Sequence, residues 1–422
     1  MIVEQEEEVT RWFVREPFNP ASPQQLLAYM EHKGYEGGHN KKSKTGNPST
    51  DEHTLQRLAR KDVLFKKILD YRAVQKIEAT YATGSLARLG KDKRLHPSFL
   101  HKPRNMRLSC VDPNLQNIPD DEDVDSLERE FRRCIVASHG CVMVETDYAG
   151  IEAVETGWYC RDPDYVRLAS YGIHTYVLSH KLGKPPNLSW DDARLSSYLH
   201  SFKQEHKASK QYRGCKVTVH ASNYGATPYL LHYENPDLFP TLRSAQEFQD
   251  FYFELCPALK TWQAEVRRRA AHDHYLGGAD HPYHFKHWFW DVVSWNSRQK
   301  KWVHGSDWQR VVAFYPASTA YGVLADASLR LCNPSSPLYV GDFFFGRTPL
   351  RALIHDSILA EVPEARLDDY VERVDAAMGT PILVQPNDWM SPEDRARFGS
   401  HLRLGVDVKV GPSWGEMEPY RR

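Results

Sequence analysis

The spacing of hydrophobic residues predicts that the first quarter of the chain is helical. Ser22-Pro23 followed by Leu26, Leu27 and Met30 is typical of a helix with a serine cap. Apolar residues then recur at helical intervals at Leu55, Leu58, Val63, Ile68, Leu69, Val74 and Ile77. Cations fill other faces at Arg57, Arg60, Lys66, Lys67, Arg72 and Lys76, and a basic loop precedes them at Lys41, Lys42 and Lys44. This pattern predicts helices whose basic faces could lie along a polyanion.

Later apolar runs predict short strands. Cys141–Asp147 indicates a buried strand that ends in an acid, and Arg351–Glu361 indicates a hairpin with His355-Asp356 at its tip. Residues 402–410 alternate like a strand, whereas residues 203–224 look helical and basic. Residues 281–303 are unusually aromatic, and a turn at Asn296-Ser297 would join two strands there.

Composition limits the class of protein. A length of 422 residues allows two to four domains, and 41% apolar content is ample for a core. There is no run of about 18 apolar residues, and the acidic N-terminus has no secretory or transit pattern. The seven cysteines include no C-x-x-C pair, which favours buried reduced thiols. We therefore expect an intracellular, cytoplasmic protein that is not inserted in a membrane.

Charge is unevenly distributed behind a net charge of -1. Residues 41–107 hold 17 Lys and Arg against 6 Asp and Glu, an excess of 11, while residues 120–130 are strongly acidic. A basic region of this kind suggests a polyanion held on one face, although a solvated helical surface gives the same pattern.

Asp147 and Asp356 are the candidate catalytic carboxylates. Phosphoryl transfer from a nucleoside triphosphate needs two Mg²⁺ ions about 3.5–4 Å apart and cations on the departing phosphates. Magnesium prefers oxygen ligands, so two aspartates on rigid strand ends suit it. Most aspartates at strand ends only form turns, so each residue alone is weak evidence.

One helix face adds the phosphate cations. Arg213, Lys216, His220 and Tyr224 are spaced i, i+3, i+7 and i+11, which places them within about 80° of one another. Two cations followed by two rings suit a triphosphate and then a sugar with its base. A basic amphipathic surface helix is the alternative, and Asn223-Tyr224-Gly225 predicts a sharp helix end.

Several motifs, in order, resemble those of the family A DNA polymerases of bacteria and phages. Residues 105–119 are similar to the R-L-S…P-N-L-Q-N-I-P signature, and Asp147–Glu152 resembles the D-Y-S-Q-I-E motif. Lys216 with His220 and Asn223–Gly225 resembles the next motif, and His355–Ser357 resembles H-D-E. The last, Val408–Gly415, resembles V-x-V-G-x-x-W-G.

The resemblance implies a role for each matching residue. Asp147 and Asp356 would bind two Mg²⁺ ions, with Mn²⁺ as an alternative, and the Tyr148 carbonyl would be a further ligand. Lys216 would act in catalysis and, with Arg213 and His174, contact the triphosphate. Glu152 and Tyr224 would exclude a ribose 2′-OH, and His220 would pack on the sugar. The residues expected on primer–template DNA are Arg107, Asn114, Gln116, Asn117, His355, Lys41, Lys42 and Lys44.

The resemblance also implies an α+β fold shaped like a right hand. The expected parts are an acidic segment (1–17), a helical thumb (18–104), a palm with an antiparallel sheet (105–165 and 308–422) and mainly helical fingers (166–307). The expected partners are primer–template DNA and dNTPs, with a separate exonuclease or processivity factor left open. Because few residues precede the thumb, we expect no proofreading exonuclease.

Departures from the family keep two alternatives open. Ala149-Gly150 replaces Ser-Gln, Tyr212 stands where the family has arginine, and the segment after Tyr315 lacks the usual glutamine. Ser357 replaces the glutamate of H-D-E, as in single-subunit phage RNA polymerases, so such an enzyme is one alternative. A catalytically silent DNA-binding relative is the other. The histidines at 272–287 could hold zinc, but a polar hairpin is the preferred interpretation.

Overall fold

The computed structural model describes residues 17–35, 38–42, 48–100, 107–118, 127–343, 347–383 and 401–421. For residues 38–42, 48, 127–129, 383 and 401 it describes the backbone alone. The chain divides into two compact units, Met1–Ala87 and Arg88–Arg422. None of the helices in these ranges is long and apolar enough to cross a bilayer.

The first unit is a small helical body. Its elements are α2 (Pro23–His32), β1 (Gly38–Lys42), β2 (Pro48–Ser49), α3 (Glu52–Ala59), α4 (Val63–Lys76), the π-helix η1 (Ile77–Thr83) and α5 (Gly84–Leu86). The Ser22 hydroxyl caps α2, as predicted, by accepting from the Gln25 backbone N–H. Leu26, Met30, Leu55, Leu58, Phe65 and Ile68 form its core.

Two predictions for this unit were wrong in detail. Val63 and Val74 were assigned to the apolar face, but both are exposed. Arg72 was expected on an outward basic face, but its guanidinium donates to the backbone carbonyls of Pro20 and Thr50. The Arg72 side chain therefore stabilises contacts within the unit, because carbonyls that are removed from water need hydrogen-bond donors.

The second unit is built on a five-stranded antiparallel sheet. Its order is β10 (Leu350–Ile354), β11 (Ser357–Pro363), β5 (Cys141–Tyr148), β14 (Val406–Gly411) and β15 (Glu418–Pro419). The buried strand and the hairpin that the sequence predicted are present. The C-terminal strand predicted over 402–410 begins only at Val406. Alternation places one row of side chains of β5 into the core, where Val144 and Tyr148 are buried.

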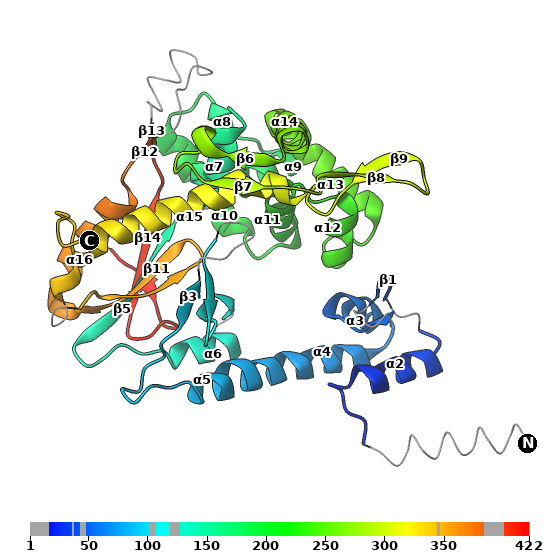
Figure 1. Ribbon diagram of the computed structural model, residues 1–422, viewed down its shortest axis with the longest axis horizontal. Helices are drawn as coiled ribbons and strands as arrows, with labels where there is room; N and C mark the ends of the chain where they lie inside the picture. The colour runs from blue at the N-terminus through cyan, green and yellow to red at the C-terminus, as the bar shows by residue number, and fades with distance from the viewer. Residues whose placement is uncertain are drawn as a thin grey trace, which may run out of the picture. The chain divides into compact units, whose positions relative to one another are not determined.

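Helices surround this sheet and fill the rest of the unit. They are α6 (Leu127–Arg133), α7 (Ile151–Tyr159), α8 (Pro163–Tyr171), α9 (Ile173–Lys181), α10 (Asp192–His206), α11 (Lys210–Asn223), α12 (Pro228–Glu234), α13 (Leu242–Leu255), α14 (Pro257–Asp273), α15 (Arg310–Cys332) and α16 (Leu367–Met378). In Figure 1, α15 runs between the sheet and the group of helices that includes α9, α11 and α14. The class is α+β, as predicted.

Short elements complete the unit. They are β3 (Ser98–Leu100) with β4 (Ser109–Val111), β6 (Tyr275–Gly277) with β7 (Lys286–Trp288), β8 (Val293–Asn296) with β9 (Lys301–His304), and β12 (Ile382–Leu383) with β13 (His401–Leu402). Single turns of 3-10 helix are η2 (Leu115–Asn117), η3 (Gly278–Asp280), η4 (Gly341–Phe343) and η5 (Glu364–Arg366).

The cysteines only partly follow the prediction of buried thiols. All seven lie in the described part of the chain and none forms a disulfide. Cys110, Cys160, Cys215 and Cys256 are buried, but Cys134 and Cys332 are exposed. The prediction was wrong for these two. Cys134 directly follows α6 and Cys332 is the last residue of α15, and at both helix ends the thiol reaches the surface.

Candidate active site

Asp147 and Asp356 meet at one end of the sheet. Ile354 pairs with Ser357 across the β10–β11 hairpin, so His355 and Asp356 form its two-residue tip. His355 has a φ of 55°, a left-handed conformation that tight turns require. Ser357 is in turn the partner of Asp147 in β5, which brings the Asp356 backbone next to the Asp147 strand.

The two carboxylates lie in a setting that opposes their negative charge. Burial, followed by the charges of Asp356 and Glu145, raises the pKa of Asp147 to about 7. Burial also raises the pKa of Asp356. A bound divalent cation would offset both the cost of burying the two negative charges and the repulsion between them, so this donor pair fits magnesium. No three His, Cys, Asp or Glu side chains within the described ranges form a ready metal site, so phosphate, water or backbone oxygens would complete the shell.

The C-terminal motif supports the same strand. Trp414 Nε1 donates a hydrogen bond to Glu145 Oε1 at 3.2 Å, and Glu145 lies two residues before Asp147. The Arg132 guanidinium lies 4.3 Å from the centroid of the Trp414 ring. This stacking holds the Trp414 ring in place. The segment that resembles V-x-V-G-x-x-W-G therefore stabilises β5 through Trp414.

Helix α11 presents the predicted cations on one exposed face. Arg213, Lys216 and His220 are exposed, whereas Tyr212, Cys215 and Val219 of the opposite face are buried. Tyr212 therefore packs in the core, and the neighbouring Arg213 takes the outward direction. The helix ends at Asn223 with Tyr224 as its C-cap, and Gly225 follows with a φ of 70°. This left-handed conformation favours glycine at the predicted sharp end, because a side chain there would strain the backbone.

Two histidines with lowered pKa values lie beside Lys216. The ring of His174, near the start of α9, stacks on His220 with centroids 6.0 Å apart. Burial, His220 and Lys216 lower the pKa of His174 to about 3. Part of the His220 side chain reaches the surface, but the protein atoms around its ring, followed by the charges of Lys216 and Arg107, lower its pKa as well. His174 Nδ1 is buried and has no hydrogen-bond partner among the described residues, so this polar atom could contact a phosphate oxygen.

Arg107 connects the two residues expected to select the sugar. Its guanidinium forms an ion pair with Glu152 and donates a hydrogen bond from Nη2 to the Tyr224 hydroxyl at 3.1 Å. Glu152 reaches this position because Gly150, with a φ of 64°, turns the chain directly into α7. The sequence placed Arg107 with the DNA contacts, and the structure brings it to the Glu152–Tyr224 pair.

The other residues predicted to contact DNA lie in different settings, some bonded within the protein and some exposed. Asn114 accepts from the Gln116 backbone N–H at the start of η2, and Gln116 Nε2 donates to the Leu353 carbonyl of β10 at 3.1 Å. Asn117 and His355 are exposed. Lys41 and Lys42 belong to β1, where only the backbone is described, and Lys44 lies outside the described residues.

Sequence reasoning missed Glu155. It lies one turn beyond Glu152 in α7 and is 1% exposed. Among the described residues, neither carboxylate oxygen finds a well-formed hydrogen bond, although the Ala320 backbone N–H favours the charged form. Burial, followed by the charge of Asp356, raises the pKa of Glu155 well above its ordinary value. Its place among Ile151 and Trp158 on the apolar face of α7 was the signal that could have revealed it.

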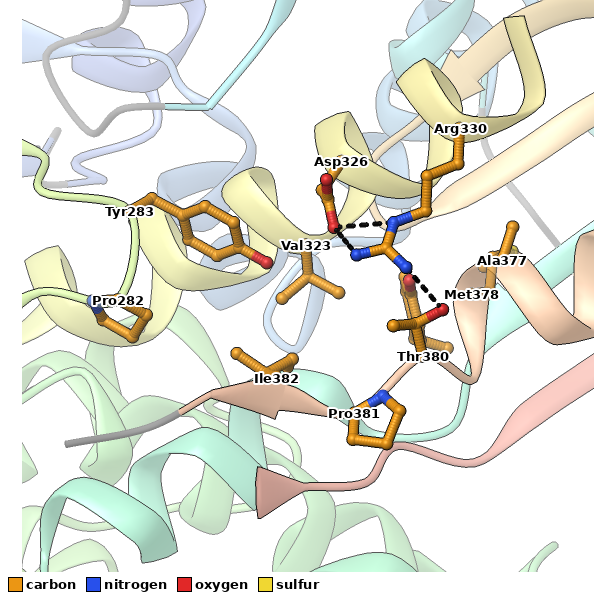
Figure 2. A pocket seen from close by; sticks show the side chains of 11 residues that line it. Pro282, Tyr283, Val323, Asp326, Arg330, Ala377, Met378, Thr380, Pro381 and Ile382 are labelled. Carbon is orange, nitrogen blue, oxygen red and sulfur yellow. Dashed lines mark hydrogen bonds and ion pairs between the residues drawn. The ribbon is translucent and has the colours of Figure 1, made fainter. Parts of the chain in front are cut away.

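Tyr148 borders a separate cavity. A cavity of about 200 Å³ is lined by Tyr148, Tyr283 and side chains of α15. Figure 2 shows Arg330 paired with Asp326 and donating to Thr380 at 3.0 Å on its wall. None of the other predicted site residues lines this cavity. It is therefore distinct from the carboxylate pair.

The predicted histidine cluster does not gather around one point. His281 is buried and its Nε2 lies 2.9 Å from the Ser318 hydroxyl, while His272 pairs with Asp273 on the surface. The sequence predicted a single polar hairpin here, and the segment contains the β6–β7 pair, which is aromatic more than polar. The separately predicted turn at Asn296-Ser297 lies between β8 and β9. Trp288, Trp290, Trp295 and Trp302 are all exposed.

Comparisons with known proteins agree with these observations. The family model for DNA polymerase family A matches residues 1–280. DNA polymerase I of Streptococcus pneumoniae R6 is 27% identical over 88% of this chain and 40% of the relative, and that of Lactococcus lactis IL1403 is 26% identical over 95% and 40%. The thermostable DNA polymerase I of Thermus thermophilus is 35% identical over 43% of this chain and 22% of the relative.

A solved structure shows the same fold. It is the POL domain of Pol1 from M. smegmatis, in complex with DNA primer–template and dNTP, and its TM-score is 0.72. The match covers 97% of this chain and 63% of that one, at 22% identity. The chain spans about 40% of the length of the first two relatives. The fold is that of a right-hand polymerase, and the chain belongs to DNA polymerase family A.

Proposed function

We propose that this chain is a DNA-directed DNA polymerase that adds dNTPs to a primer 3′-OH and releases pyrophosphate. The observation that carries the proposal is the meeting of Asp147 with Asp356 at one end of the sheet, in a chain of this family. Paired, partly buried carboxylates at a strand end and a hairpin tip suit divalent-cation chemistry on phosphates. Primer–template DNA and dNTPs are accordingly the proposed partners.

The carboxylates would hold two Mg²⁺ ions, together with the Tyr148 carbonyl. When bound, these ions lower the pKa of the primer hydroxyl and stabilise charge on the phosphates. Asp147 and Asp356 would set the position of the ions, because β5 and the β10–β11 hairpin are rigid elements of one sheet. Mn²⁺ also prefers such oxygen ligands and would substitute.

The exposed face of α11 would bind the triphosphate. Lys216 and Arg213 would neutralise its charge, and Lys216 would give a proton to the leaving pyrophosphate. His174 would contact a phosphate oxygen as a neutral imidazole. His220 stacks on His174 and would pack on the sugar.

Glu152 and Tyr224 would form the gate that excludes ribose. Arg107 now joins them, which supports a gate whose parts are held in place before a nucleotide arrives. Asn114, Gln116, Asn117 and His355 would follow the primer–template minor groove, where correct pairs share acceptors. Lys41, Lys42 and Lys44 would contact phosphates from the proposed thumb, residues 18–104, and the proposed fingers span 166–307.

One observation favours a second candidate. Ser357 lies beside the metal pair where H-D-S is typical of single-subunit RNA polymerases. Against this stands Glu152, which occupies the position of a gate against ribose. The two candidates differ in the sugar they accept, so substrate choice separates them.

Extension of a labelled primer tests the proposal. We expect extension with dNTPs and Mg²⁺, termination with ddNTPs, poor use of rNTPs and no product with EDTA. Extension with rNTPs as fast as with dNTPs would favour the RNA polymerase alternative. Normal binding of primer–template without any extension would favour the silent relative. Mg²⁺-dependent digestion of the primer by the pure protein would refute the expected lack of proofreading.

A further inference from the structure

The β8–β9 hairpin exposes a face of aromatic side chains that the proposed reaction does not use. Trp295 and Trp302 are directly opposite each other in its register, so their rings lie on the same face. Their centroids are 5.7 Å apart with the planes at 69°. Trp302 is nevertheless 66% exposed and Trp295 is 54% exposed. Figure 1 shows the hairpin projecting beyond α12 and α13.

Two further tryptophan rings are exposed in the neighbouring segment. Trp288 of β7 and Trp290 stack with planes 4° apart and centroids 5.4 Å apart. Trp290 is 71% exposed, and Lys286 Nζ lies 4.6 Å from the Trp288 ring centroid. A cross-strand pair stabilises a hairpin without a partner, but four exposed tryptophans in fifteen residues are characteristic of a binding surface.

The charges beside these rings indicate what binds. Arg298, Lys300 and Lys301 surround the hairpin turn, and residues 292–306 contain no acid. Asp291, which precedes the hairpin, accepts from the Ser294 hydroxyl and the Ser306 backbone N–H, so its carboxylate is bonded at the base of the hairpin. Flat exposed rings beside cations that pair with no acid in the described part of the chain match a chain of unstacked bases linked by phosphates. An aliphatic protein partner would not need these cations.

We propose that the β8–β9 hairpin, Val293–His304, binds single-stranded template DNA by stacking bases on Trp295 and Trp302 and pairing phosphates with Arg298, Lys300 and Lys301. Base stacking on an aromatic ring is tolerant of sequence, which suits a template. The identity of the strand as template rests on the proposed polymerase function. Binding itself does not, because no reaction is required for it.

A leucine and a phenylalanine variant separate stacking from general apolar contact. Trp302→Leu keeps apolar area but removes the flat ring, whereas Trp302→Phe keeps a ring. The measurement is the Kd for two labelled duplexes, one with a long single-stranded template overhang and one blunt. We expect Trp302→Leu to weaken binding of the overhang duplex by about fivefold or more, Trp302→Phe by less, and neither to change blunt binding.

A charge variant tests the same surface without touching the rings. Lys300→Glu should weaken overhang binding and reduce its dependence on salt, while Lys184→Glu, an equal charge change on an exposed residue elsewhere, should not. Thermal unfolding of each variant identifies any that has lost its fold, and the charge variant then carries the test. Because binding is measured without catalysis, a failure of the proposed polymerase activity would show in primer extension alone.

Two outcomes would overturn the proposal. One is equal affinity of wild type, Trp302→Leu and Lys300→Glu for the overhang duplex. The other is self-association of the wild-type chain that Trp302→Leu abolishes and single-stranded DNA leaves unchanged, which would assign the surface to a second copy of this chain.

Discussion

Ser357 lies directly opposite Asp147 across the β11–β5 ladder. On the other side of β5, Asp407 of β14 is also the partner of Asp147. Residues that face each other in an antiparallel pair share one side of the sheet. Asp147 is therefore flanked by a neutral hydroxyl and an exposed carboxylate, and the hydroxyl stands at the place of the glutamate in the H-D-E motif that this segment resembles.

Restoring a carboxylate at this position should tighten metal binding. Ser357→Glu places a third negative charge beside Asp147 and Asp356, and carboxylate number sets the affinity of oxygen sites for divalent cations. We expect the Mg²⁺ concentration for half-maximal primer extension to fall by about tenfold, or ~1.4 kcal/mol. In EDTA the same variant should unfold at a lower temperature than wild type because the charges repel.

Ser357→Gln is the matched control, since it has nearly the same volume as glutamate and no charge. It should leave the Mg²⁺ requirement close to that of wild type. If the glutamine and glutamate variants shift the requirement equally, then volume at this buried position, and not charge, governs the site.

Removing the Glu152 carboxylate should open the site to ribose. Glu152→Ala deletes one wall of the proposed gate and releases Arg107 from its ion pair. We expect the preference for dNTP over rNTP, measured as a ratio of kcat/KM values, to fall by about tenfold or more, or ~1.4 kcal/mol. Glu254→Ala, at an exposed carboxylate on α13, serves as control, and an unchanged ratio in Glu152→Ala would exclude the gate.

Glu155 should make stability decrease with pH. Burial raises its pKa in the folded protein, so the folded state holds a proton that the unfolded state releases above about pH 4.5. Its contribution is complete below that pH and is lost as pH rises toward the folded pKa. Glu155→Gln should therefore gain about 1.4 kcal/mol on wild type for each pH unit in this window, measured by urea unfolding. A difference that is constant with pH would contradict a buried neutral acid.

Glu361 should make the stability of the fold decrease as pH falls. Burial alone would raise its pKa, but hydrogen bonds from Arg94, Ser138 and Arg351 outweigh this and lower the pKa to about 2. The carboxylate thus contributes stability above the unfolded pKa near 4.5, which is lost as pH falls toward 2. Glu361→Gln should cost about 3 kcal/mol of unfolding free energy at pH 7 and little near pH 2. An equal loss at both values would show that packing, not charge, is responsible.

The sequence predicted most of the sheet and the site because both depend on local patterns. An apolar run ending in Asp147 and two runs meeting at His355-Asp356 specify strands and a hairpin tip directly. The one-sided spacing of Arg213, Lys216 and His220 specified an exposed helix face. Helical periodicity and strand alternation express burial, so they can be read without coordinates.

Features that depend on distant partners escaped the sequence. Arg107 is far from Glu152 and Tyr224 in the sequence and contacts them only in the folded chain. Arg72 does not lie on an outer basic face, because it donates hydrogen bonds to the carbonyls of Pro20 and Thr50. Glu155 was overlooked because glutamate in a helix normally faces water. The roles of individual site residues remain predictions, and the subdomain boundaries do as well.

The central claim is that Asp147 and Asp356 are the metal-binding carboxylates of a DNA polymerase. The most direct test is single-turnover extension of a labelled primer by Asp356→Asn, with Asp407→Asn as the control that removes an exposed carboxylate partnered with Asp147. We predict that Asp356→Asn binds primer–template as wild type does but extends it about a thousandfold more slowly, a loss of ~4 kcal/mol in transition-state stabilisation, while Asp407→Asn stays within a few-fold of wild type. Extension by Asp356→Asn at the wild-type rate would contradict the claim.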